Sequence, residues 1–176
     1  MLYLIIFIST IFLTSRGHLM YENLTGVAQI SHYHFIVIIF TFLTACFFAS
    51  KMLKIFQILP LKHLKYYQFL IIITAIIMSS GSLFTYQMNG TDIYSKLHVY
   101  CSMFGCISFL ILLFIYTRKL SFYYPKLYIK IHWFFDLSLQ FLCILLIVFT
   151  RVNGYIEILY AGIVCFYLYT IEKNIN

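Results

Sequence analysis

The sequence predicts an all-α polytopic membrane protein, a helical bundle with six transmembrane helices that form a single domain over residues 1–176. Hydrophobic residues make up 63% of the chain and charged residues 10%. A soluble domain of this size could not bury so much apolar surface. The connections between the apolar stretches are too short to hold a second domain. Six apolar stretches are present: Leu2–Thr14, Ile30–Ser50, Tyr67–Tyr86, Val99–Tyr116, Ile131–Thr150 and Tyr155–Ile171.

The first stretch is short for a membrane span and has the length of a signal peptide. It lacks a basic segment at its start, and no small-x-small cleavage pattern precedes Arg16. We therefore expect Leu2–Thr14 to remain as the first helix of the bundle.

The basic residues predict the orientation of the helices. The net charge is +7. Two connections are strongly basic, whereas the other three together contain Arg16, Lys96 and Arg151. The positive-inside rule then places both basic connections and both termini in the cytosol. The basic residues adjoin the membrane ends, so we expect membrane lipid and no nucleic acid as a partner. The two basic connections contain Lys51, Lys54, Lys62 and Lys65, and Arg118, Lys119, Lys126 and Lys130.

Two glycosylation sequons agree with this topology. They begin at Asn23 and Asn89, and both lie in connections that the charge bias assigns to the non-cytosolic side. They predict a glycoprotein of a eukaryotic endomembrane or plasma membrane. All five cysteines lie inside predicted spans, and their spacing fits small buried hydrophobic residues better than a disulfide framework or a zinc site.

Four histidines lie near the starts of four consecutive spans: His34, His63, His98 and His132. Helix starts alternate between the two faces of an antiparallel bundle. His34 and His98 would therefore lie near one surface, and His63 and His132 near the other. Two facing histidines at each surface would be able to hold two haem irons. The alternative for each single histidine is a place in the polar interface with no special role.

The residues that share a helical face with these histidines refine the prediction. His34 shares its face with Thr41 and Ala45, whereas His32 points to the opposite side and is expected at lipid or the interface. Cys101, Ser102 and Gly105 follow His98 on its face. Such small residues either leave room for a flat macrocycle or allow helices to pack closely, and both interpretations stay open.

The third and fifth spans give further expectations. Pro60 suits a first helical turn and would place His63 within it. His132 is followed on one stripe by Asp136, a carboxylate well inside a span. Burying that charge is costly, so Asp136 should face the bundle interior and have a partner. It would orient His132, accept a proton or stay protonated, whereas Glu157 begins the last span nearer the outer surface.

With these residues in view, about residues 30–150 resemble the cytochrome b561 family of transmembrane di-haem electron carriers. The segment Tyr94-Ser95-Lys96-Leu97-His98 is similar to the entry to the fourth helix of many members. Tyr124-Pro125-Lys126-Leu127 is similar to the loop before the fifth helix in shorter members. The chain departs from the family at Ser102, where a glycine is usual, and at Lys62-His63, where the pattern is usually fuller.

This resemblance implies transmembrane electron transfer by an oxidoreductase of the ferrireductase type. Two haem b groups would be held by His34 with His98 and by His63 with His132, each iron carrying electrons because two histidines leave no open position. A cytosolic reductant such as ascorbate would bind near Lys62 and Lys65. The acceptor on the other side would be ferric iron or oxidised ascorbate, and the choice between monomer and homodimer stays open.

A second resemblance leads to a different function. Tyr21-x-x-x-Thr25-Gly26 is similar to a motif of the damage-regulated autophagy modulator family, as are Gly81 to Gln87 before His98. The last span adds Glu157 followed by Ala161, Phe166, Tyr167 and Thr170. Members have six helices, and the resemblance implies a non-enzymatic protein that organises membrane or lipid, in connection with autophagy. In that case His98, Asp136 and Glu157 would be polar packing contacts between helices.

Overall fold

The computed structural model describes residues 1–30, 32–84 and 92–175, and over these ranges the fold is all-α without strands. Asn89 and Tyr86 lie outside the described residues. Within the described ranges, five helices are long and apolar enough to cross a membrane. They are α3 (His34–Ile58), α4 (Leu64–Gly81), α5 (Ile93–Tyr123), α6 (Pro125–Phe149) and α7 (Gly154–Ile175). The chain is thus an integral membrane protein with a polytopic helical bundle, as predicted.

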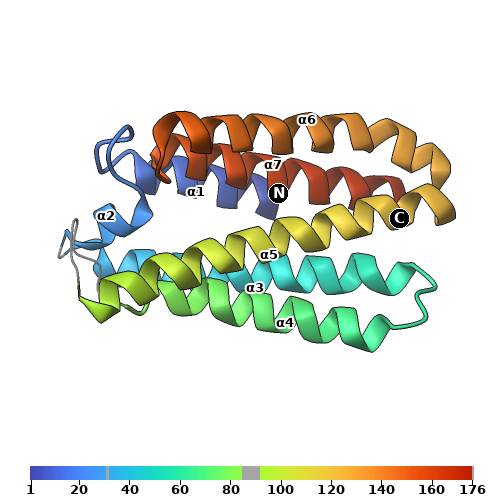
Figure 1. The fold of residues 1–176 in the computed structure, drawn as a ribbon, viewed down its shortest axis with the longest axis horizontal. Helices are drawn as coiled ribbons and strands as arrows, with labels where there is room; N and C mark the ends of the chain where they lie inside the picture. Colours follow the sequence, from blue (N-terminus) through green and yellow to red (C-terminus); the bar gives the residue numbers. More distant parts are fainter. Residues whose placement is uncertain (31, 85–91, 176) are drawn as a thin grey trace.

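The first helix, α1 (Leu2–Thr14), has the bounds that the sequence predicts, but its 13 residues rise about 20 Å. A hydrocarbon core is about 30 Å thick, so α1 is shorter than a full span. In Figure 1 it runs from one end of the bundle to about the middle. A seventh helix among the described residues was not expected from the sequence: α2 (Leu24–Ala28) is one turn long, and one turn shows no periodicity.

The bounds of the long helices differ from the predicted apolar stretches: α3 begins later, at His34, α4 ends earlier, at Gly81, and most other ends extend beyond the stretch. α5 continues to Tyr123, through Arg118 and Lys119, and α3 continues to Ile58, through Lys51 and Lys54. Lysine and arginine are good helix formers, so a helix need not end where its apolar stretch ends. The expected helical turn after Pro60 is wrong, because α4 begins at Leu64 and His63 is its N-cap residue.

The helices form two groups of three (Figure 1). α3, α4 and α5 pack together, as do α1, α6 and α7, and the α5–α6 and α3–α7 contacts join the groups. We name the two ends of the bundle by their contents. The α2 end contains α2, the end of α4, the start of α5 and the α6–α7 connection. The basic end contains the α3–α4 and α5–α6 connections and the last turn of α7.

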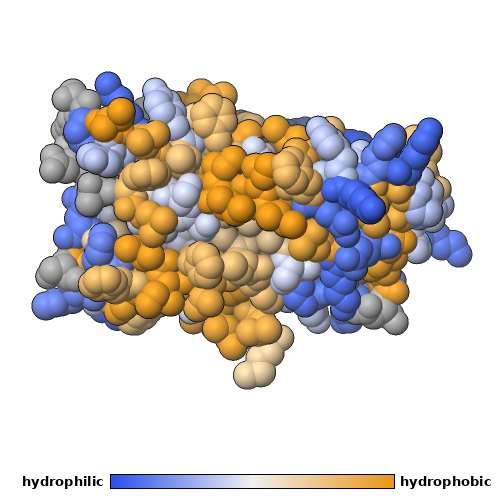
Figure 2. Space-filling view, turned by 90° about the horizontal axis from the view of Figure 1, so that it is seen from below, coloured by the Kyte–Doolittle hydropathy of each residue, from blue (hydrophilic) through white to orange (hydrophobic). Residues whose placement is uncertain are grey.

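The main core is one cluster of large apolar and aromatic side chains that come from both groups of helices, and close aromatic pairs lie within each group. The rings of Phe56 and Tyr116 lie 5.1 Å apart, and those of Phe135 and Tyr167 lie 4.7 Å apart. Most other large apolar side chains point outwards, as a lipid environment requires. Figure 2 shows an apolar belt, with hydrophilic side chains gathered in a broad patch at the basic end.

The α5 helix, which carries His98, starts with a side-chain cap. The Asp92 carboxylate accepts hydrogen bonds from the Ser95 hydroxyl at 2.7 Å and the Ser95 backbone N–H at 2.9 Å. These two bonds favour the charged carboxylate and hold the pKa of Asp92 below its usual range. The cap fixes the start of α5, and His98 follows within its second turn.

Candidate functional site

His98 lies at the centre of a buried polar cluster at the α2 end. Its side chain is 6% exposed. Nδ1 lies 2.6 Å from the Gly81 carbonyl oxygen, and Nε2 lies 2.7 Å from the Thr25 hydroxyl oxygen. A carbonyl can only accept, so Nδ1 carries a proton, and in a neutral ring Nε2 accepts from Thr25. One imidazole of α5 therefore connects α2 with the end of α4.

Glu157 of α7 holds the other side of α2. Its carboxylate oxygen Oε2 accepts a hydrogen bond from the Leu24 backbone N–H at 2.6 Å. The neighbouring residue Asn23 is the N-cap and accepts from the Gly26 N–H at 3.1 Å. The first amides of a helix have no partner within it, and these two acceptors satisfy two of them. The Glu157 carboxylate, near the start of the last span, thus has a backbone partner.

The rest of the segment between α1 and α3 is also fastened to the bundle. The Gly154 N–H donates to the carbonyl oxygens of Leu19 at 3.0 Å and Glu22 at 2.8 Å. Nδ1 of His34 lies 3.1 Å from the Ala28 carbonyl oxygen. These bonds attach the connection to α7 and α3, so it forms a cap over the α2 end.

The small residues that follow His98 bring α5 into close contact with α4. A Cβ atom added to Gly105 would lie 2.6 Å from Cα of Met78, too close for any real side chain. A Cβ added to Gly81 would collide with the Ser102 side chain and lie 3.1 Å from the Ser102 backbone nitrogen. Of the two interpretations that the sequence left open for this strip, close helix packing is the one observed.

The other three predicted haem ligands have separate surroundings. His63 is exposed at the N-cap of α4. Nδ1 of His132 lies 2.9 Å from the carbonyl oxygen of Tyr128, and the two rings stack at 4.5 Å. His34 is half-buried at the first residue of α3, and His32, the rejected alternative, is exposed. Lys62 and Lys65, the predicted donor site, are both exposed.

This arrangement does not fit a haem at His98. Both of its ring nitrogens are engaged, and the backbone of α4 occupies the space beside Gly105 where a macrocycle would lie. Among residues 1–30, 32–84 and 92–175, no group of three or more His, Cys, Asp or Glu side chains is placed to hold a metal ion. The four haem ligands stay a prediction from the sequence. The contacts of His98 argue against a haem between His34 and His98.

Asp136 has the partner that a carboxylate within a span requires. Arg118 of α5 donates from Nη2 to both carboxylate oxygens, at 2.9 and 3.0 Å, and Nη1 donates to the Tyr128 hydroxyl at 2.9 Å. The sequence assigned Arg118 to a connection because it follows the apolar stretch. The continuation of α5 brings it beside α6 instead, and the pair faces the α5–α6 contact rather than the bundle centre.

A second ion pair lies at the basic end, between α3 and α7. Glu172 accepts from Lys51 at 2.8 Å and lies 3.8 Å from Lys54, and its other oxygen accepts from the Tyr3 hydroxyl at 2.8 Å. This contact ties the start of α1 to α7. Nothing in the spacing of these residues along the sequence predicts it.

Sequence reasoning about haem missed the importance of Thr25 and Gly81, which complete the His98 cluster. The residues that resemble the damage-regulated autophagy modulator family include both of them, together with His98 and Glu157. Comparisons with protein-family models, with curated proteins and with solved structures give no match to this chain.

Proposed function

We propose that this chain is a non-enzymatic membrane protein that organises membrane or lipid, as its similarity to the damage-regulated autophagy modulator family implies. One observation carries the proposal. Thr25, Gly81, His98 and Glu157, which that similarity selects from distant parts of the chain, belong to a single hydrogen-bonded cluster that holds α2. In this role the histidine and the glutamate are tertiary contacts, and the functional surface is the lipid-facing exterior.

The proposed orientation follows the charge bias: the basic end, with the last turn of α7, lies in the cytosol, and the α2 end lies on the other side of a eukaryotic endomembrane or plasma membrane. Asn23 would then be accessible to glycosylation. Its Oδ1 serves the α2 cap, whereas the side-chain nitrogen that a glycan would modify is not part of that hydrogen bond.

Electron transfer through two haem groups is the competing prediction, and one measurement separates the two. We expect the absorption spectrum of the purified protein to show no haem bands, whether oxidised or reduced with dithionite. Bands that shift on reduction would contradict the proposed function and support the cytochrome b561 resemblance. In the haem-free case, the protein reconstituted in phosphatidylcholine vesicles should change acyl-chain order, measured with a polarity-sensitive membrane dye. Unchanged order would contradict the organising role.

The link between the cluster and α2 is testable with two variants of one residue. Glu157→Leu removes the acceptor of the Leu24 N–H, so we expect hydrogen exchange over Leu24–Ala28 to accelerate by about tenfold, the effect of losing one partly buried hydrogen bond. Glu157→Gln keeps an acceptor oxygen and is the matched control, with exchange close to that of the wild type. Equal exchange in all three proteins would show that Glu157 does not hold α2.

A further inference from the structure

The charges at the basic end are strongly unbalanced. Of the acids there, Glu172 is engaged by Lys51 and Lys54, and Asp136 by Arg118. Six lysines remain for which the structure gives no carboxylate within ion-pair distance among the described residues. An end with this excess attracts anionic membrane lipids. These lysines are Lys62, Lys65, Lys119, Lys126, Lys130 and Lys173.

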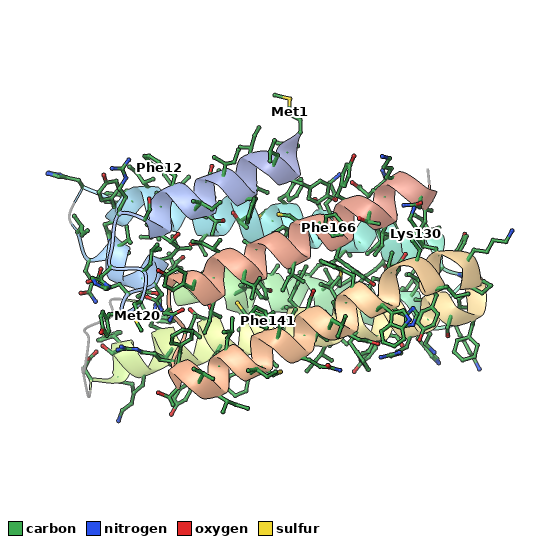
Figure 3. The ribbon with its side chains drawn as sticks, turned by 90° about the horizontal axis from the view of Figure 1, so that it is seen from above. Met1, Phe12, Met20, Lys130, Phe141 and Phe166 are labelled. Atoms are coloured by element: carbon green, nitrogen blue, oxygen red, sulfur yellow. The ribbon has the colours of Figure 1, made fainter. Side chains whose placement is uncertain are left out.

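One of these lysines lies at the mouth of a groove between α6 and α7. The groove has a volume of about 120 Å³. Its lining includes an exposed aromatic pair across the two helices, because the rings of Phe134 and Phe166 lie 4.7 Å apart, and two buried side chains, Ile131 and Tyr167. In Figure 3 the labelled residues Lys130 and Phe166 lie on this face, towards the basic end. The lining residues are Lys130, Ile131, Phe134, Phe166, Tyr167 and Thr170.

From the basic end towards the middle of the bundle, the polar mouth of the groove comes first and its apolar part follows. Nζ of Lys130 lies 2.8 Å from the side-chain oxygen of Asn174, so the two helices are bridged at the mouth. Lys126 is exposed one turn earlier on the same face of α6. Lys130 lies about 8 Å from the start of α6, and Phe134 follows one turn deeper. The groove therefore has a cation at its mouth, and its aromatic lining begins one helical turn further into the apolar layer.

We propose that the α6–α7 groove binds one anionic phospholipid of the leaflet at the basic end. The headgroup phosphate contacts Lys130, with Lys126 beside it, and one acyl chain lies along Phe134 and Phe166. A phospholipid has a charged headgroup at the interface and an apolar chain below it. The groove has a cation at its mouth and apolar side chains below it, so the two match. The inference names a lipid class for the proposed function and rests on that function.

Photocrosslinking tests the site directly. The full-length protein is reconstituted in phosphatidylcholine vesicles that contain about one phosphatidylserine in ten, a trace of it with a photoreactive group in the acyl chain. We expect the label to map to α6 and α7 around Phe134 and Phe166, and excess unlabelled phosphatidylserine should compete where phosphatidylcholine does not. Lys130→Ala should lower the labelling about fivefold, the contribution expected of one interfacial lysine, and Lys130→Arg should restore most of it.

The matched control is Lys65→Ala, which removes the same charge from the same end but on α4, in the other group of helices. It should leave labelling of the groove unchanged. An equal loss in both lysine variants, competition by phosphatidylcholine, or a label elsewhere on the bundle would overturn the specific site. These outcomes differ from failure of the proposed function, which haem bands or unchanged acyl-chain order would show.

Discussion

The two ends of the bundle use their polar residues in opposite ways. The α2 end contains three basic residues, Arg16, Lys96 and Arg151, and three acids, Glu22, Asp92 and Glu157. Asp92 and Glu157 accept backbone hydrogen bonds, and a buried histidine joins three elements. The basic end accounts for the whole net charge of +7, and most of its lysines are exposed.

This difference shows that polar side chains stabilise the tertiary structure at the α2 end, whereas at the basic end they set the electrostatic potential of the surface. At the α2 end a polar group is buried, so it needs a partner, and losing that partner costs free energy. At the basic end a lysine reaches water or a lipid headgroup without folding cost, so its loss changes binding more than stability. Substitutions at the two ends should therefore differ in size and in what they affect.

The largest effect should come from the closest helix contact. Gly105→Ala places a methyl group against the Met78 backbone, which has to move, so we expect the free energy of unfolding to fall by about 3 kcal/mol. Gly162→Ala is the matched control, because its added Cβ meets the edge of the Phe7 ring at 3.0 Å. Heating in detergent followed by size-exclusion chromatography gives both midpoints. Equal losses in the two variants would refute the α4–α5 contact.

A smaller effect is expected from the cluster histidine. His98→Ala leaves the Gly81 carbonyl and the Thr25 hydroxyl without their partner, at a cost of about 2 kcal/mol in stability. His63→Ala, at the exposed N-cap of α4, should leave the midpoint nearly unchanged. The same heating experiment measures both proteins. If His63→Ala were as damaging as His98→Ala, the two ends would not differ as described.

The smallest effect is expected from the ion pair between α5 and α6. The side chain of Arg118 is 42% exposed and that of Asp136 is 26% exposed, so their attraction is partly screened. A double-mutant cycle with Arg118→Gln and Asp136→Asn should give a coupling free energy of about 0–1 kcal/mol. A coupling of several kcal/mol would place this pair with the buried contacts of the α2 end.

Much of the architecture was predictable from the amino-acid pattern. An apolar run of about 20 residues has to cross a membrane as a helix, because its backbone groups find no other partners there. The five long helices and the need of Asp136 for a partner follow from that physics, whereas Leu2–Thr14 is too short for it and was predicted from its apolar run alone. The ends of the helices were not predictable, because a lysine such as Lys51 or Lys119 is found as readily within a helix as in the connection that follows it.

The partners of the polar residues were decided by the tertiary structure. The spacing of four histidines is equally compatible with two haem sites and with interfacial side chains, because spacing fixes depth and not direction. Contacts such as Thr25 with His98, Leu24 with Glu157 and Tyr3 with Glu172 join residues that are distant in the chain. They depend on the rotation of each helix about its axis, which is set by how closely neighbours such as Gly105 and Met78 approach. The small residues after His98 indicate that a close helix contact is possible there, but which helix makes it is a property of the packed bundle.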